Sequence, residues 1–216
     1  VEMELSKALM ALAAVPLLAA QYQVKHGTLT IDERGVSYQE TGKKLPRHFS
    51  WAYQDIQQLE LAPARVRVLT YKDNTRRLGA DFAYTFDALA GEDFTGSYPL
   101  LKDRLDQRFI AELADAAVQP LWSVPVKLLG TITGSEGILT VGRDRIVYST
   151  ARKGASRTWR YGDIDNIGTS GPFALTLTTF ERALEHYGNR KDFNFQLKEP
   201  LDARKYDELW RTLHHE

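Results

Sequence analysis

Hydrophobic and polar residues alternate with a period of two in several short stretches of this 216-residue chain. Such alternation predicts strands with one buried face and one exposed face. The stretches lie at residues 29–31, 36–38, 66–68 and 82–86, and again at 146–148, 175–177 and 193–197. Polar links rich in glycine and charge, such as DERG at 32–35 and GRDR at 142–145, separate them and favour hairpins. The pattern therefore predicts a mainly β protein with sequentially connected antiparallel strands.

Two stretches near residues 100 and 205 have helical spacing instead. Apolar residues step by four in the first, and follow the i, i+3, i+4, i+7 stripe in the second. The two sets are Leu101, Leu105, Phe109 and Leu113, then Tyr206, Leu209, Trp210 and Leu213. Pro99 and Pro200 precede the helices, and Asp103 and Asp202 are expected to cap them. Each group of strands is thus predicted to close with one helix.

The strand pattern occurs twice, with nearly constant spacing. HGTLTIDERGVSY at 26–38 aligns without a gap with EGILTVGRDRIVY at 136–148, and WAYQDIQQL at 51–59 aligns with WRYGDIDNI at 159–167. The spacing changes only between apolar blocks, where surface loops tolerate insertions and strands do not. A repeat of about 110 residues is a whole domain. We therefore expect a first copy at 21–118 and a second copy at 119–216, joined by the short apolar link VQPLWSV at 118–124.

These motifs resemble the GRAM and bacterial pleckstrin-homology-like domains. The shared pattern is Gly-x-Leu-x-Leu/Val, an aliphatic residue and a Tyr, a basic hairpin, Trp-x-Tyr-x-Asp-Ile, Phe-x-Phe and a closing helix. The resemblance implies two tandem split barrels, each a bent antiparallel sheet capped by a C-terminal α-helix. It also implies a non-enzymatic module that binds lipids, peptides or proteins.

Composition narrows the possible partners. Lys plus Arg equals Asp plus Glu at 28 each, so no global field attracts nucleic acid, and any binding of anions must be local. The chain contains no cysteine, which removes disulfides and thiolate chemistry. Residues 8–20 form an apolar run of thirteen, too short to span a bilayer. Residues 1–20 are therefore expected to be either a signal peptide, which would place the protein in the periplasm or outside the cell, or a packed N-terminal helix of a cytoplasmic protein.

Basic residues gather on one predicted hairpin of each copy, between its second and third predicted strands. Lysine and arginine on such a hairpin can bind phosphate oxygens through charge-assisted hydrogen bonds. The candidate residues are Lys43, Lys44 and Arg47 in the first copy, with His48 beside them, and Arg152, Lys153, Arg157 and Arg160 in the second. The preceding hairpins, IDERGV and VGRDRI, carry acids among their bases. Anionic lipid headgroups are therefore the alternative to a protein or peptide partner.

Enzymatic chemistry has little support in the sequence. The five histidines, His26, His48, His186, His214 and His215, form no metal-binding motif, and no nucleophile elbow or phosphate-binding loop is present. The sequence predicts no catalytic residue, no cofactor and no metal site. The inserts at 88–99 and 181–190 are where the copies differ, and the second holds Glu181, Glu185, His186, Asn189 and Arg190. An uncharacterised hydrolase with a site there remains a distant alternative.

Overall fold

The computed structural model describes residues 19–75, 80–130, 133–182 and 190–214, and its main secondary structure is β. The prediction of a mainly β protein is thus confirmed. In the first copy the strands are β1 (Ala20–Val24), β2 (Gly27–Ile31), β3 (Gly35–Glu40), β4 (His48–Ala52), β5 (Ile56–Ala62), β6 (Arg65–Asp73) and β7 (Asp81–Asp87). A 3-10 turn, η1 (Tyr53–Asp55), joins β4 to β5, and η2 (Phe94–Ser97) leads into the helix α1 (Tyr98–Arg104).

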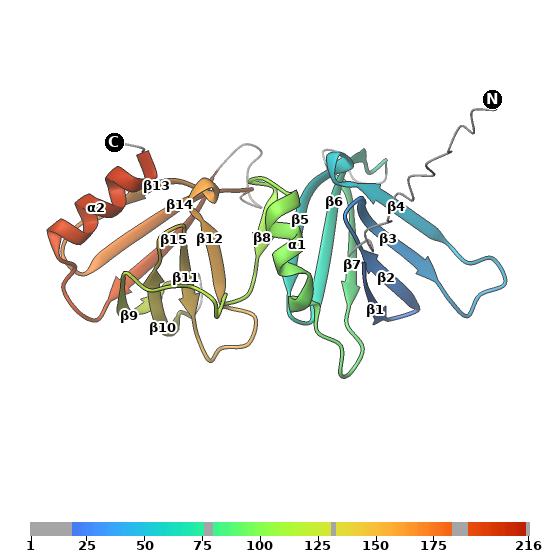
Figure 1. Ribbon diagram of the computed structural model, residues 1–216, viewed down its shortest axis with the longest axis horizontal. Helices are drawn as coiled ribbons and strands as arrows, with labels where there is room; N and C mark the ends of the chain where they lie inside the picture. Colours follow the sequence, from blue (N-terminus) through green and yellow to red (C-terminus); the bar gives the residue numbers. More distant parts are fainter. Residues whose placement is uncertain (1–18, 76–79, 131–132, 183–189, 215–216) are drawn as a thin grey trace, which may run out of the picture.

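The second copy repeats this order. Its strands are β9 (Trp122–Leu128), β10 (Ser135–Val141), β11 (Arg145–Ser149), β12 (Arg157–Arg160), β13 (Ile164–Gly168), β14 (Ala174–Arg182) and β15 (Arg190–Leu197). The 3-10 turn η3 (Tyr161–Asp163) joins β12 to β13, and the helix α2 (Ala203–His214) follows β15. One further strand, β8 (Phe109–Ala111), lies between the two copies (Figure 1).

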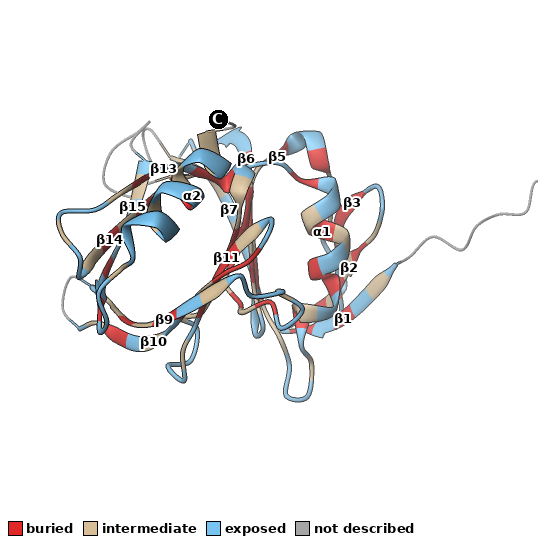
Figure 2. Ribbon diagram, turned by 60° about the vertical axis from the view of Figure 1, so that its left-hand side comes forward, coloured by how far each residue is buried: buried red, intermediate tan, exposed pale blue. Residues whose placement is uncertain are grey.

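Hydrogen bonding joins most strands into one sheet. The order β13-β14-β15-β9-β10-β11-β12-β8-β5-β6-β7 runs through both copies, while β1-β2-β3-β4 form a separate sheet. In the second copy the last strand, β15, pairs with the first, β9, over three residues. In the first copy the equivalent strands, β7 and β1, meet only through the bridge between Val24 and Ala88. Each copy encloses its own cluster of buried apolar side chains. Figure 2 shows buried residues along the strands of both copies.

Equivalent residues of the two copies have the same local environments. A Cβ on Gly27 would lie 2.2 Å from the carbonyl oxygen of Gln39, and one on Gly137 would lie 2.2 Å from that of Ser149. The Tyr53 hydroxyl donates to the Asp32 carbonyl, and the Tyr161 hydroxyl donates to the Gly142 carbonyl. Both strands that follow the 3-10 turns have a register shift at their start, between Ile56 and Gln58 and between Ile164 and Asn166. The aligned phrases therefore encode the same substructure twice.

The prediction of a helix through residues 101–113 is wrong over most of that range. Helix α1 ends at Arg104, Leu105 is extended, and Phe109 lies in β8 instead of on a helix face. After the helix has ended, the Asp106 carboxylate accepts from the Arg108 backbone N–H at 3.0 Å, in a turn that leads into β8. Asp103 lies inside α1 and does not cap it, whereas the Asp202 carboxylate does accept from the Arg204 N–H at 2.8 Å.

Two further expectations need correction. Because β1 and β9 come before the first alternating stretches, IDERGV and VGRDRI form the second hairpin of each copy, and the basic hairpins join the third strand to the fourth. The insert at 88–99 is partly core: Phe94 is fully buried, and Ser97 is within 2.7 Å of the Tyr22 hydroxyl. Residues 1–18 lie outside the described residues. Among those described, no helix is long and apolar enough to cross a membrane.

We expect Gly27→Ala and Gly137→Ala each to lower the free energy of unfolding by about 1–3 kcal/mol, because the added methyl group overlaps a carbonyl oxygen of the neighbouring strand. Chemical denaturation monitored by tryptophan fluorescence measures this. Gly162→Ala is the control, since a Cβ there has no described atom within 4 Å. Equal stability of all three variants would show that the two strand contacts do not constrain the fold.

Candidate functional site

Strand β8 occupies one edge of each copy. It pairs in parallel with β5, where Leu59 N–H donates to the Arg108 carbonyl at 2.9 Å and Glu112 N–H donates to the Leu61 carbonyl at 2.7 Å. On its other side Ala111 pairs with Thr158 of β12. The two copies are therefore joined by the pairing of β8 with a strand of each.

Two of the predicted phosphate-binding arginines hold this junction. The Arg160 guanidinium donates to the carbonyls of Lys102, Leu105 and Asp106, the last at 2.7 Å, and to the Asp163 carboxylate at 2.7 Å. Arg157 forms an ion pair with Glu112 at 2.6 Å and is 13% exposed. Burial raises the pKa of Asp163, and the hydrogen bond from Arg160 opposes that rise. Arg160 thus serves the junction and is not part of an exposed basic cluster.

The other predicted cations lie on hairpins of different copies. Lys43 forms an ion pair with Glu40 at 2.6 Å, and its hydrogen bond holds the pKa of that carboxyl below its usual value. Lys44 and Arg47 are exposed beside it. In the second copy the Arg152 guanidinium donates to the Thr133 hydroxyl at 3.1 Å, and Lys153 is exposed. The seven candidate residues therefore do not converge on one site.

A cavity of about 330 Å³ lies under the basic hairpin of the second copy. Its cationic lining residues are Arg152, Lys153 and Arg157, and the Nε of Arg157 is buried without a hydrogen-bond partner. The opposite wall includes Leu129, Gly130 and Thr133 of the β9–β10 connection. That connection is longer than the tight β1–β2 turn of the first copy. The aligned repeat begins at residue 136, so this connection has no counterpart in it.

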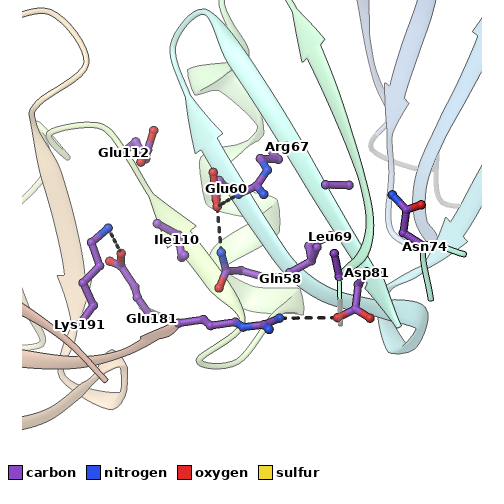
Figure 3. Close-up of a pocket in the computed structure, with 13 residues that line it drawn as sticks. Gln58, Glu60, Arg67, Leu69, Asn74, Asp81, Ile110, Glu112, Glu181 and Lys191 are labelled. Atoms are coloured by element: carbon purple, nitrogen blue, oxygen red, sulfur yellow. Dashed lines mark hydrogen bonds and ion pairs between the residues drawn. The ribbon is translucent and has the colours of Figure 1, made fainter. Parts of the chain in front are cut away.

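A second cleft, of about 500 Å³, lies at the junction of the copies (Figure 3). Most of its charged side chains form internal ion pairs, which include Glu60–Arg67 at 2.7 Å, Arg182–Asp81 at 3.5 Å and Lys191–Glu181 at 3.0 Å. Glu181 also accepts from the indole N–H of Trp159 at 3.2 Å. The cleft is therefore a charged junction whose side chains satisfy one another.

Of the described residues of the second predicted insert, Glu181 and Arg182 line that cleft. The Arg190 guanidinium lies 4.4 Å from the ring centroid of Phe180. Glu185, His186 and Asn189 lie outside the described residues. Among the described residues, no group of three or more His, Asp or Glu side chains could hold a metal ion.

Apart from β1 and β7, which meet at the bridge between Val24 and Ala88, each copy has one terminal strand with no strand paired to its outer side among the described residues. These are β4 in the first copy, at the end of the four-stranded sheet, and β13 in the second, at the end of the larger sheet. Helix α2 lies beside β13, where the Tyr206 hydroxyl donates to the Ile167 carbonyl at 3.3 Å. Beside β4 lies a groove of about 310 Å³ over the outer face of β3 and β4.

No protein-family model matches this chain, and no curated protein matches it. Among solved structures, it is similar to the C-terminal domain of an unknown protein from Leishmania infantum, with 14% identity and a TM-score of 0.35 over 46% of this chain and 87% of that chain. It is also similar to the Spt16D Pob3N heterodimer, with 12% identity and a TM-score of 0.31 over 76% of this chain and 82% of that chain. At these values neither similarity carries an argument about function.

We expect Arg160→Lys to lower the free energy of unfolding by about 2–3 kcal/mol, because lysine keeps the charge but cannot serve three carbonyls and a carboxylate together. Urea denaturation measures the change. Arg152→Lys, on an exposed hairpin, is the matched control. If Arg160→Lys proved as stable as that control, the arginine would not be holding the junction.

Proposed function

We propose that this protein is a non-enzymatic, tandem pleckstrin-homology-like binding module that receives an extended segment of a protein partner at an open strand edge. The observation that supports the proposal is β8, because the chain already binds a short extended segment of its own at the edges of β5 and β12. Strand addition satisfies main-chain donors and acceptors of an exposed edge, and side-chain contacts then provide specificity.

The two open edges extend this logic to a partner. An exposed edge presents unpaired N–H and C=O groups, which proteins cover, charge or use for binding. Strands β4 and β13 are the repeat equivalents of β12 and β5, the two strands that receive β8. A partner strand at either open edge would therefore use a backbone arrangement that this fold already uses once in each copy.

A peptide selected for binding to the full chain from a displayed random library should bind with a Kd in the micromolar range and without turnover. Methylation of alternate backbone nitrogens in that peptide should weaken binding at least about tenfold, because two or more main-chain hydrogen bonds are lost. Isothermal titration calorimetry compares the two peptides, and a peptide methylated at the opposite set of nitrogens is the control. Equal affinity of all three peptides would contradict strand addition.

Anionic headgroups are a second candidate ligand, favoured by the cavity under the second basic hairpin. There Arg152 and Lys153 lie beside Arg157, whose Nε has no partner within the described residues. A phosphate oxygen would supply the acceptor that this buried nitrogen lacks. The proposed headgroup site is thus confined to the second copy.

Flotation with vesicles of phosphatidylcholine and phosphatidylserine tests this candidate. Binding should fall as salt rises, since exposed charges are screened, and Arg152→Glu with Lys153→Glu should abolish it. Lys43→Glu is the control, because that lysine lies in the other copy and is paired with Glu40. Flotation that is insensitive to salt, or equally weakened by the control, would reject the headgroup site.

A further inference from the structure

We infer that the extended partner segment binds along β4 and the adjoining outer face of β3, and that this segment is acidic. The inference rests on the proposed function and specifies its edge and its ligand chemistry. The same surface is covered in the second copy and uncovered in the first.

In the second copy, residues 111–118 cover the equivalent surface. After Ala111 pairs with Thr158, the Thr158 hydroxyl donates to the Leu113 carbonyl at 2.8 Å and accepts from the Asp115 N–H at 3.0 Å. The Asp115 carboxylate forms an ion pair with Arg145 of β11. Val118 then packs at Gly142, where a Cβ would lie 2.7 Å from a Val118 methyl carbon. A segment of this chain that carries Glu112 and Asp115, and that turns at residues 116–117, therefore crosses the face of β11 and β12.

In the first copy the corresponding surface is open. Ser37 pairs with Ser50 in the first copy, and the aligned residues Val147 and Thr158 pair in the second. The two surfaces therefore match residue by residue. Val147 and Thr158 are each 3% exposed, whereas Ser37 is half-buried and Ser50 is exposed. The groove of about 310 Å³ lies here, lined by both serines, Arg34 and Ala52 among others. The first copy thus presents an unfilled form of a surface that binds a segment of the chain in the second.

Strand β4 is the more accessible of the two open edges. At β13 the Tyr206 hydroxyl already binds the Ile167 carbonyl, and Arg190 forms an ion pair with Asp165 at 3.5 Å. At β4, Ser50 and His48 are exposed, and no described element lies along the outer edge. A partner strand at β4 would displace no contact that the described residues make.

Charge indicates the chemistry of the partner. The segment that covers the second copy places Glu112 against Arg157 and Asp115 against Arg145. In the first copy Phe49 and Gly35 occupy the positions of Arg157 and Arg145. The cations near this surface are instead Arg34, which lines the groove, and Lys44 and Arg47, which lie at the other end of β4.

The acids near this surface already have partners within the chain. The Asp32 carboxylate accepts from the Arg34 and Gly35 N–H groups at 2.7 and 3.1 Å, and Glu40 is paired with Lys43. Glu33 pairs with Arg104 at 3.6 Å. Backbone N–H groups do not neutralise the Asp32 carboxylate, which lines the groove together with Arg34. The cations with no carboxylate partner among the described residues therefore lie at the other end of β4, at Lys44 and Arg47. Acidic residues of a partner segment beside His48 would lie near them.

The test is a random twelve-residue peptide library displayed on phage and selected on the full chain. Selected peptides should be enriched in Asp and Glu. On adding the tightest synthetic peptide, hydrogen exchange followed by mass spectrometry should show protection of residues 48–52. Lys44→Glu with Arg47→Glu should weaken binding at least about tenfold, because attraction becomes repulsion. Arg204→Glu is the matched control, since that side chain is 90% exposed on α2.

Each other outcome overturns the inference in a distinguishable way. Protection at 164–168 would place the partner on β13, so that the proposed function stands and the chosen edge is wrong. Neutral or basic selected peptides would reject the acidic partner even if they bind at β4. Concentration-dependent dimers protected at 48–52 without peptide would identify a second copy as the occupant. Selection of no peptide would count against both the edge and the function.

Discussion

The pairing of β8 with both β5 and β12 is the constraint on which the rest of this structure depends. A strand of three residues has little stability of its own, yet its backbone is satisfied on both sides because each copy offers one edge to it. Arg160 then fixes the preceding loop by donating to its carbonyls. The larger sheet is continuous across both copies for this reason, and each copy keeps its other edge open.

Features set by local periodicity could be predicted from the sequence. Alternation placed Leu29, Ile31, Phe195 and Leu197 on the inner faces of strands, where all four are buried. The repeated Trp-x-Tyr-x-Asp-Ile phrase falls at the 3-10 turn between the fourth and fifth strands of each copy, and the repeat itself was visible in the sequence. The positions of these residues depend on neighbours within their own copy, so local periodicity in the sequence was sufficient to predict them.

Features set by contacts between the copies could not be predicted in this way. Leu105, Phe109 and Leu113 step by four as in a helix, but Phe109, Ala111 and Leu113 also alternate as in a strand, and all three are buried. Only the presence of two free edges decides between these patterns. The same contacts convert Arg157 and Arg160 from hairpin cations into junction residues, because their partners, Glu112 and the carbonyls near Asp106, come from the other copy.

The duplication also explains how the two copies could take different roles with the same backbone. In the second copy the outer face carries Arg145, Val147 and Thr158, which contact or lie beneath residues 111–118. Because that segment belongs to the same chain, its effective concentration at this face is always high. In the first copy Gly35, Ser37 and Ser50 occupy those positions and remain compatible with water. For the proposed partner binding, the polar side chains on this face keep it compatible with water while it is uncovered.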